Sequence, residues 1–528
     1  MAELLHDLIF ESASRSPSQT ALKYKSSTLT YAELAEQVEH LSRALIDIGV
    51  EKQDRIAIYL PKCLENVIAI FAASAAGAVF VPINPALKPH QVSHILLDSE
   101  AKVLITTQGK CRALNTALGY CVDLQSVILT DDVDSEDEEI HTQRLLAWDE
   151  LIAASPVTVR VHRVIDSDMV SLIYTSGSTG DPKGVILSHR NMVTGAKSVA
   201  QYLNNSPSDR ILAVLPLSFD YGMSQLTTAF LVGASVVLIN YLLPMEVLNT
   251  LAQERITGLA AVPPLWNLLV ELPWPGEAAA NLRYITSSGG VVPVETTELL
   301  RQMLPKTEIY LMYGLTEAFR STYLPPEQIE KRPTSIGKAI PNAEVLVLRS
   351  DGTPCAVDEP DELVHRGSLV AMGYWNDVEA TEQRFRPIPN RVDAIPGEEI
   401  AVWSGDIVKM DSEGYLYFLR RDDELIKTMG YRVSPNEIEE IFYRSGLVSE
   451  VVALGIPHTT IGQSIVLVAI PKNGVEVTEK LLLDDCKQRL ASYMMPAEII
   501  FRSSLPTNQN GKVDRKQLAL EVLESVSA

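Results

Sequence analysis

Helix-like and strand-like segments alternate along roughly the first 300 residues, and this alternation restricts the architectures open to the chain. Thr30 and Glu33 have the spacing of a capping box, and apolar residues then recur at helical intervals as far as Ile48. A short strand-like segment follows at residues 55–60. Alternating helices and strands typically form helical layers on mostly parallel sheets, so we expect a large domain of layered α/β sheets.

The sequence pattern changes in the second part of the chain. Between about residues 340 and 420 the predicted strands are short and Gly, Pro and Asp interrupt them, which is typical of an antiparallel, barrel-like subdomain. Beyond it, a predicted helix near residues 435–442 and predicted strands near 451–455 and 465–470 favour a small α+β domain. We therefore predict two domains, residues 1–420 and residues 421–528.

Composition narrows the functional classes. The formal net charge is −22 and Lys and Arg form no cluster, which argues against nucleic-acid binding. The five cysteines are widely spaced without a CxxC pair, so we expect neither a disulfide framework nor a zinc site. The N-terminus lacks a signal-peptide pattern, and the apolar run at residues 67–83 is better explained by a buried helix and strand than by a membrane span. We expect a cytoplasmic protein.

The strongest local signal is a glycine-rich loop at residues 174–184, Tyr-Thr-Ser-Gly-Ser-Thr-Gly-Asp-Pro-Lys-Gly, between two apolar runs. Glycines let backbone N–H groups approach phosphate oxygens, hydroxyl groups add donors, and Lys183 adds charge. The loop is not a Walker A motif, because Pro182 and Lys183 stand where Gly-Lys is required and Gly184 replaces the Ser or Thr. An ordinary hairpin turn needs only about two to five residues. The loop therefore predicts a phosphate site of another type.

A second segment, residues 310–318, places a glycine and the pair Thr316-Glu317 after a predicted strand. A hydroxyl there can bind a phosphate oxygen and a carboxylate can bind Mg²⁺, although a simple helix start would look the same.

Two further segments contain single charged residues that can contact a nucleotide. Asp406, in residues 403–407, can accept both hydroxyls of a ribose, and Arg421 follows the strand-like residues 414–418. A turn aspartate and a surface arginine are the alternatives. Lys512 follows a glycine in the polar loop at residues 505–515, where a solvated turn lysine is the alternative.

In this order and spacing, the four segments resemble those of the adenylate-forming superfamily of acyl-CoA synthetases, nonribosomal peptide adenylation domains and firefly luciferase. The resemblance extends from residues 30–34 to Lys512, with looser matches at residues 80–85, 215–217 and 373–376. Within this superfamily, the chain is similar to AMP-forming acyl-CoA ligases associated with exosortase A loci, around residues 215–221 and 313–321.

The resemblance implies a ligase that activates a carboxylic acid with ATP and Mg²⁺, forms an acyl-adenylate and pyrophosphate, and passes the acyl group to the thiol of CoA or of a carrier protein's phosphopantetheine. The implied catalytic residues are Lys183, Thr316, Glu317 (which also holds the metal) and Lys512. The implied ATP site consists of Thr175, Ser176, Gly177, Ser178, Thr179, Gly180, Lys183, Ser288, Gly289, Tyr313, Gly314, Thr316, Asp406, Phe418 and Arg421.

The resemblance also implies a mobile C-terminal domain. It rotates about Asp423 once pyrophosphate has left, withdraws Lys512, and presents the loop with Lys427, Gly430 and Tyr431 to a pantetheine tunnel. The chain departs from the family in having Arg420 instead of glycine beside the hinge and Asp361 instead of a glycine before Glu-Leu. The first departure bears on the ease of rotation.

The implied acyl pocket is polar, which favours a small polar acid or amino acid over a long fatty acid. It consists of Asp220, Tyr221, Ser224, Ile285, Ser287, Met312, Arg320 and Ser321. Asp220 stands where amino-acid-activating members pair with the substrate ammonium, and a helix cap is the alternative role. Arg320 could instead face solvent.

Several other functions stay open on the sequence alone. A medium- or long-chain acyl-CoA synthetase and an aryl-CoA ligase would use the same ATP site. An inactive homologue acting as a binding scaffold, and an unrelated kinase or ATPase, are alternatives of other classes. The mismatch to the Walker A motif argues against a kinase or ATPase. We expect a monomer or a homodimer.

Overall fold

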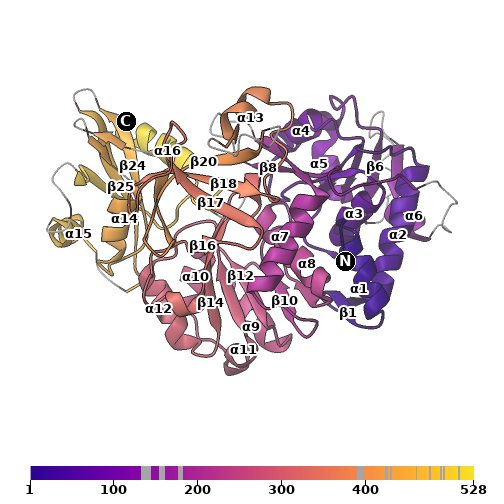
Figure 1. Ribbon diagram of the computed structural model, residues 1–528, viewed down its shortest axis with the longest axis horizontal. Coiled ribbons are helices and arrows are strands. Elements are labelled where there is room, and N and C mark those ends of the chain that lie inside the picture. The colour runs from indigo at the N-terminus through magenta and orange to yellow at the C-terminus, as the bar shows by residue number, and fades with distance from the viewer. Residues whose placement is uncertain are drawn as a thin grey trace.

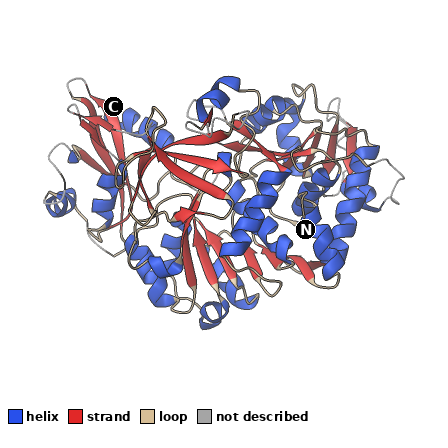
Figure 2. Cartoon of the chain, in the orientation of Figure 1, coloured by secondary structure: helices blue, strands red, loops and turns tan. Residues whose placement is uncertain are grey.

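The computed structural model describes residues 2–131, 144–153, 161–175, 182–388, 398–421, 426–428, 431–433, 435–458, 461–474, 477–487, 490, 494–508 and 512–527. Figure 1 shows the N-terminal elements, in indigo and magenta, at one end of an elongated molecule and the C-terminal elements, in yellow, at the other. Helices flank the sheets throughout (Figure 2).

A seven-stranded sheet lies in the N-terminal part of the described chain, in the order β7-β6-β5-β3-β4-β8-β9. Its strands are β3 (Arg55–Tyr59), β4 (Val79–Pro82), β5 (Val103–Thr106), β6 (Ser126–Leu129), β7 (Arg144–Ala147), β8 (Met169–Thr175) and β9 (Lys183–Ser188). All neighbours pair in parallel except β8 and β9, which are antiparallel. The predicted glycine-rich loop therefore connects two antiparallel neighbours at the edge of a parallel sheet.

A nine-stranded sheet stands beside it, in the order β16-β15-β14-β13-β12-β10-β11-β1-β2. Its strands are β1 (Thr20–Tyr24), β2 (Ser27–Thr30), β10 (Arg210–Ala213), β11 (Ser235–Leu238), β12 (Gly258–Ala261), β13 (Tyr284–Ser287), β14 (Glu308–Tyr313), β15 (Thr322–Leu324) and β16 (Lys338–Ala339). Strands β14, β13, β12, β10, β11 and β1 lie in this order and pair in parallel with their neighbours. Strand β2 pairs antiparallel with β1. The predicted layered α/β architecture is confirmed.

Helices cover both sheets, as parallel sheets require. They are α1 (Asp7–Arg15), α2 (Tyr31–Asp47), α3 (Leu64–Ala75), α4 (Pro89–Asp98), α5 (Gln108–Leu118), α6 (Trp148–Ala153), α7 (His189–Tyr202), α8 (Asp220–Val232), α9 (Pro244–Gln253), α10 (Pro263–Val270), α11 (Gly276–Asn281) and α12 (Val294–Met303). The predicted capping box begins α2, where Thr30 Oγ1 accepts a hydrogen bond from the Glu33 amide and the Thr30 amide donates to Glu33 Oε2. The apolar run at residues 67–83 forms α3 and β4, as predicted.

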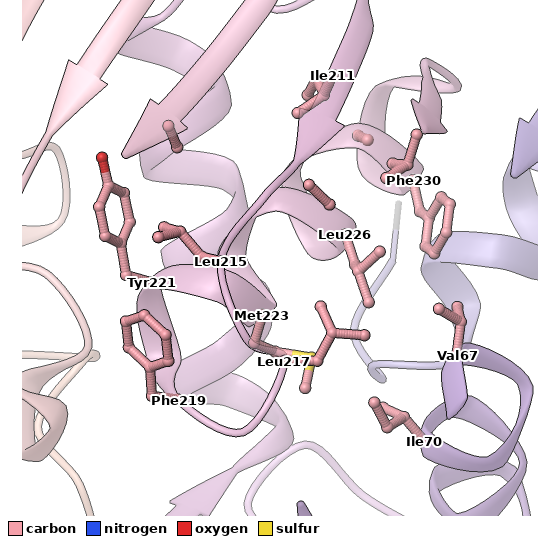
Figure 3. Packing of buried hydrophobic residues seen from close by; sticks show 14 of the residues in the cluster. Val67, Ile70, Ile211, Leu215, Leu217, Phe219, Tyr221, Met223, Leu226 and Phe230 are labelled. Atoms are coloured by element: carbon pink, nitrogen blue, oxygen red, sulfur yellow. The ribbon is translucent and has the colours of Figure 1, made fainter. Parts of the chain in front are cut away.

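The main core lies where α3 and α8 meet between the two sheets. Val67 and Ile70 of α3 face Leu226 and Phe230 of α8 (Figure 3). The rings of Phe71 and Phe230 meet edge to face with their centroids 5.4 Å apart, an arrangement that aromatic pairs prefer. This packing fixes α8, whose first turn reaches the carboxyl ends of the strands of the larger sheet.

The predicted barrel-like subdomain is an antiparallel sheet of five strands within the described residues. Its elements are β17 (Ala343–Leu348), β18 (Asp361–Gly367), α13 (Val378–Arg384), β19 (Phe385–Pro387), β20 (Ile400–Met410) and β21 (Leu416–Arg421). It follows two short 3-10 helices of the larger sheet's loops, η1 (Thr316–Ala318) and η2 (Pro326–Gln328).

The C-terminal part is a mixed sheet flanked by helices, which confirms the predicted α+β class. Its elements are β22 (Ile426–Thr428), β23 (Tyr431–Val433), α14 (Pro435–Tyr443), β24 (Val448–His458), β25 (Gly462–Pro471), α15 (Glu479–Cys486), β26 (Glu498–Phe501) and α16 (Arg515–Ser527). Two apolar clusters are built only from residues of this part, which is what a separate folding unit requires. The boundary between residues 420 and 421 stays a prediction.

No helix in the described ranges is both long and apolar enough to cross a bilayer.

Candidate active site

The candidate site lies at the carboxyl ends of parallel strands in the larger sheet, where open α/β sheets bind their ligands. β13 and β14 are parallel neighbours, with Ser287 opposite Leu311. Ser288-Gly289, which follow β13, and Tyr313-Gly314, at the end of β14, therefore lie side by side, as the implied nucleotide site requires. Asp220, at the start of α8, reaches the same edge through the hydrogen bond that Thr316 donates to it.

Thr316 and Glu317 form the short 3-10 helix η1 and not the start of an α-helix. Thr316 Oγ1 donates a hydrogen bond of 3.2 Å to Asp220 Oδ1, and Tyr374 Oη donates one of 2.5 Å to Glu317 Oε1. Burial and the neighbouring Glu317 carboxylate raise the pKa of Tyr374. The phenol therefore stays protonated and holds the Glu317 carboxylate in place.

Glu317 is suited to a hard cation because Mg²⁺ prefers carboxylate oxygens. Among the described residues, no group of three or more His, Cys, Asp or Glu could hold a metal ion without other ligands. A magnesium ion at Glu317 would therefore take its remaining ligands from substrate phosphates and water, which is its usual arrangement in nucleotide sites.

The glycine-rich loop is anchored at both ends. Thr175 ends β8 and pairs in register with Lys183 at the start of β9. Lys183 Nζ lies 2.9 Å from Asp377 Oδ2 and 5.7 Å from the centroid of the Tyr374 ring. This ion pair holds the ammonium beside the tyrosine that binds Glu317. The predicted phosphate-binding residues Ser176, Gly177, Ser178, Thr179 and Gly180 lie outside the described residues.

Asp406 and Tyr313 form the part of the site predicted to bind ribose and adenine. Asp406 lies on β20, is 6% exposed, and accepts a hydrogen bond from Tyr313 Oη. The Phe418 ring on β21 lies 6.4 Å from the Tyr313 ring, centroid to centroid. Arg421 pairs in register with Asp406, and its side chain lies outside the described residues. The structure thus gathers four residues of the predicted nucleotide site from two different sheets.

Lys512 reaches this site from the C-terminal part of the chain. Gly289 has a φ of +89°, and a Cβ placed there would lie 2.9 Å from Lys512 Cε and 3.6 Å from its Nζ. The lysine stem therefore lies against the backbone just beyond β13, in the space that the missing side chain leaves. A second cross-contact, the 2.9 Å ion pair between Lys472 and Glu295, joins the same two parts of the chain.

The hinge and tunnel residues are less fully described. Asp423 and Gly430 lie outside the described residues. Lys427 belongs to β22 and Tyr431 begins β23, and only their backbones are described.

A small cavity lies between α7, α8 and the sheet. It is lined by Val199, Leu203, Ile211, Tyr221, Ser224, Gln225, Thr228, Tyr284, Thr286, Met312 and Arg320. Four predicted pocket residues, Tyr221, Ser224, Met312 and Arg320, are therefore part of its wall. The other four do not line it.

Strand alternation explains two of the differences. Because successive side chains of a strand face opposite sides, Tyr284 and Thr286 on the cavity side leave Ile285 and Ser287 on the other. The helical spacing of Tyr221, Gln225 and Thr228 would have indicated the missing lining residues of α8. Ser321 is fully buried and bonded to His365 Nδ1 at 2.9 Å, away from the cavity. Burial lowers the pKa of His365 to about 4, so this histidine is neutral.

Asp220 and Arg320 form a buried ion pair that the sequence did not indicate. Arg320 is 2% exposed, so the solvent-facing alternative is wrong. Its Nη1 donates a hydrogen bond of 2.9 Å to Asp220 Oδ2 and one of 3.1 Å to the Phe319 carbonyl. Phe219 is the N-cap residue of α8 and no side chain caps the helix, so the capping role proposed for Asp220 is wrong too. Both carboxylate oxygens of Asp220 have partners in the protein.

This pair removes the argument for an amino-acid substrate. That prediction relied on the cost of a buried carboxylate without a partner, and Arg320 is now that partner. Activation of an amino acid stays a prediction without a structural basis at Asp220.

Comparison with known proteins agrees with this geometry. The AMP-binding enzyme family matches residues 9–375, and the AMP-binding enzyme C-terminal domain matches residues 437–512. A linear gramicidin synthase of Brevibacillus parabrevis is 30% identical over 518 residues, which are 97% of this chain and 10% of that protein. The chain thus spans about a tenth of that synthase. The long-chain-fatty-acid–CoA ligase of Escherichia coli O157:H7 is 27% identical over 544 residues, covering 97% of this chain and 94% of the ligase.

Solved structures share the whole fold. The o-succinylbenzoate CoA synthetase of Bacillus subtilis, in complex with its acyl-adenylate intermediate, has a TM-score of 0.80 at 28% identity and covers 97% of both chains. The anthranilate CoA ligase AuaEII, in complex with anthranoyl-AMP, has a TM-score of 0.87 at 24% identity, covering 99% of this chain and 98% of that one. The likeness to AuaEII shows the fold alone. The finer resemblance to exosortase-associated ligases stays a prediction.

Proposed function

The chain belongs to the AMP-binding enzyme family, and from this premise we propose that it activates a small polar carboxylic acid with ATP and then transfers the acyl group to a thiol. The observation that carries the proposal is the position of Lys512. Its side chain, from the C-terminal part, lies against Gly289 at the strand ends where Thr316, Glu317 and Tyr313 converge.

Lys512 supports the first reaction. A carboxylate oxygen attacks the α-phosphorus of ATP, a bond to that oxygen forms, and the bond to the pyrophosphate oxygen breaks. Both reactants are anionic and repel each other increasingly toward the transition state. An ammonium group between them offsets that repulsion, and it needs no reorganisation because it is already positioned. Magnesium bound to Glu317 would neutralise part of the charge on the phosphates.

The remaining residues hold the nucleotide. We assign Asp406 to the ribose hydroxyls, with Arg421 beside it. Tyr313 and Phe418 lie close to this carboxylate and offer ring faces for the adenine. We assign the hydroxyl of Thr316 to the α-phosphate and the glycine-rich loop with Lys183 to the other phosphates. The ion pair of Lys183 with Asp377 supports this role because it keeps the ammonium group near Tyr374, which binds Glu317.

For the second reaction we propose that residues 421–528 rotate about Asp423 and bring Lys427, Gly430 and Tyr431 to the adenylate. The thiol of CoA or of a carrier protein then attacks the acyl carbon, and AMP leaves. The long-chain-fatty-acid–CoA ligase and the peptide synthases among the relatives are consistent with either acceptor.

The cavity supports a small acid. It is small, and its hydroxyl-bearing walls suit a short polar acyl group better than a medium or long alkyl chain.

Release of AMP and pyrophosphate tests the proposed function. Purified protein should release pyrophosphate from ATP only when a suitable carboxylic acid is present, and should release AMP in equal amount when a thiol acceptor is also supplied. A kinase would form ADP, and a scaffold would form neither product, so either result would exclude adenylate formation.

A further inference from the structure

The guanidinium group of Arg320 has one edge that the protein does not use. Nη1 binds Asp220 and the Phe319 carbonyl, whereas Nε and Nη2 are buried and have no hydrogen-bond partner among the described residues. Nε carries one N–H group and Nη2 carries two. Leaving buried donors unpaired is costly, and nearly all such groups in proteins have a partner, either in the protein or in an ordered water molecule or ion.

The unused edge belongs to a residue that lines the cavity. Arg320 forms part of the cavity wall, whereas Asp220 does not. The Tyr221 ring, another part of the wall, lies 4.6 Å from Arg320 Cζ and holds the guanidinium by a cation–π contact. The arginine cannot withdraw to solvent, because it is 2% exposed.

The cavity is also next to the reacting end of the proposed site. A Cβ at Gly314 would lie 3.4 Å from Arg320 Nη1, so the guanidinium lies directly behind the strand end that carries Tyr313 and Thr316. An acid whose reacting carboxylate lies near Lys512 would extend its other end toward the cavity.

The geometry of the edge selects the ligand. Nε–H and one Nη2–H point in parallel, and this fork matches the two oxygens of a carboxylate. An ammonium group would meet donors and a positive charge, and an alkyl chain would leave the donors unpaired. The Thr228 hydroxyl lines the same cavity, has no partner among the residues described, and can donate a further hydrogen bond.

We propose that the Nε–Nη2 edge of Arg320 binds the distal carboxylate of a short dicarboxylic acid, which this chain activates at its other carboxylate. The inference rests on the proposed function and specifies its substrate class. Asp220 is then a positioning residue, because it fixes the guanidinium by its opposite edge and does not itself contact the acid.

The test compares matched acids in wild type and in Arg320→Lys, which keeps the charge and loses the fork. The panel pairs each short dicarboxylic acid with the monocarboxylic, hydroxy and amino acids of the same chain length, and the readout is kcat/KM for pyrophosphate release. We expect the dicarboxylic acids to be preferred in wild type. In Arg320→Lys, kcat/KM should fall about tenfold or more for the dicarboxylic acid, the effect of losing a hydrogen bond to a charged group, and change little for its monocarboxylic analogue.

Two further variants provide a second test at the cavity and a control away from it. Thr228→Val leaves the Asp220–Arg320 pair intact and should lower kcat/KM for the dicarboxylic acid alone by about three- to tenfold, the effect of one hydrogen bond. Arg349→Lys alters an exposed arginine that pairs with Glu359 at 2.6 Å, and it should leave both substrates unaffected. If Arg320→Lys fails to fold, the Thr228 variant still tests the inference.

The outcomes separate the inference from the proposed function. Equal use of monocarboxylic and dicarboxylic acids, preference for hydroxy or amino acids, or a nonselective loss in both variants would overturn the inference while leaving adenylate formation intact. If no acid in any class supports release of pyrophosphate, the proposed function fails, and the inference fails with it.

Discussion

Replacing Lys512 with alanine should nearly abolish acyl-adenylate formation and leave thioester formation from a supplied acyl-adenylate close to the wild-type rate. The lysine stem lies against Gly289, just beyond β13, where we propose that it offsets the repulsion between a carboxylate and the α-phosphate. Loss of one preorganised group that stabilises developing charge typically costs a factor of about 10²–10³ in kcat. In the proposed rotation, the C-terminal domain withdraws Lys512 from the reaction centre once pyrophosphate has left, so the second reaction should not depend on it.

The two half-reactions are measured separately, by acid-dependent pyrophosphate release and by thioester formation from synthetic adenylate. Lys487→Ala is a matched control, because Lys487 is an exposed lysine of the same C-terminal part and pairs only with the nearby Asp484 among the contacts described. It should affect neither reaction. An equal loss of both reactions in Lys512→Ala would show that the lysine supports the fold or the closed arrangement, and would contradict a role confined to adenylation.

Removing the carboxylate of Asp220 should destabilise the protein. Asp220→Ala leaves Arg320, which is 2% exposed, without its ion-pair partner. Breaking a buried pair by removing one member costs about 3–5 kcal/mol, because the remaining charge stays buried and uncompensated. Thr316 Oγ1 also loses its acceptor. The free energy of unfolding, measured in urea with and without the substitution, checks this expectation.

A surface pair and a double variant provide the controls for this measurement. Glu330→Ala breaks the exposed pair with Arg301 and should cost less than about 1 kcal/mol. Asp220→Ala combined with Arg320→Leu should recover part of the lost stability, since no unpaired charge remains. Unchanged stability in Asp220→Ala, together with a selective loss of activity toward amino acids, would instead restore Asp220 as the group that pairs with a substrate ammonium.

Local patterns predicted the parts of the fold that depend on neighbouring residues. The capping box at Thr30 depends on residues of one helical turn, and the apolar run that forms α3 and β4 depends on consecutive residues. Both have the predicted form. The change to short, interrupted strands after residue 340 likewise predicted the antiparallel subdomain. These patterns are local because side-chain periodicity and turn chemistry act over a few residues.

Long-range pairs could not be predicted in the same way. Asp220 and Arg320 are 100 positions apart, and nothing near either residue indicates the other. The same applies to Tyr374 with Glu317 and to Tyr313 with Asp406, which come from different elements. The approach of Lys512 to Gly289 was expected only from the family resemblance. Side chains along β13 alternate between the two faces of the sheet, and this alternation was visible in the sequence. We predicted Ile285 and Ser287 as pocket residues, whereas Tyr284 and Thr286 line the cavity.

The fate of the carboxylate oxygens tests acyl-adenylate formation most directly. A carboxylic acid that the protein activates is labelled with heavy oxygen in its carboxylate, and each turnover should transfer one labelled oxygen to AMP. That oxygen forms the bond to the α-phosphorus and remains on AMP when the thiol takes the acyl group. Mass spectrometry of the AMP gives the answer. AMP with one labelled oxygen is the predicted result, whereas unlabelled AMP, or label recovered in inorganic phosphate with ADP as the product, would contradict adenylate formation.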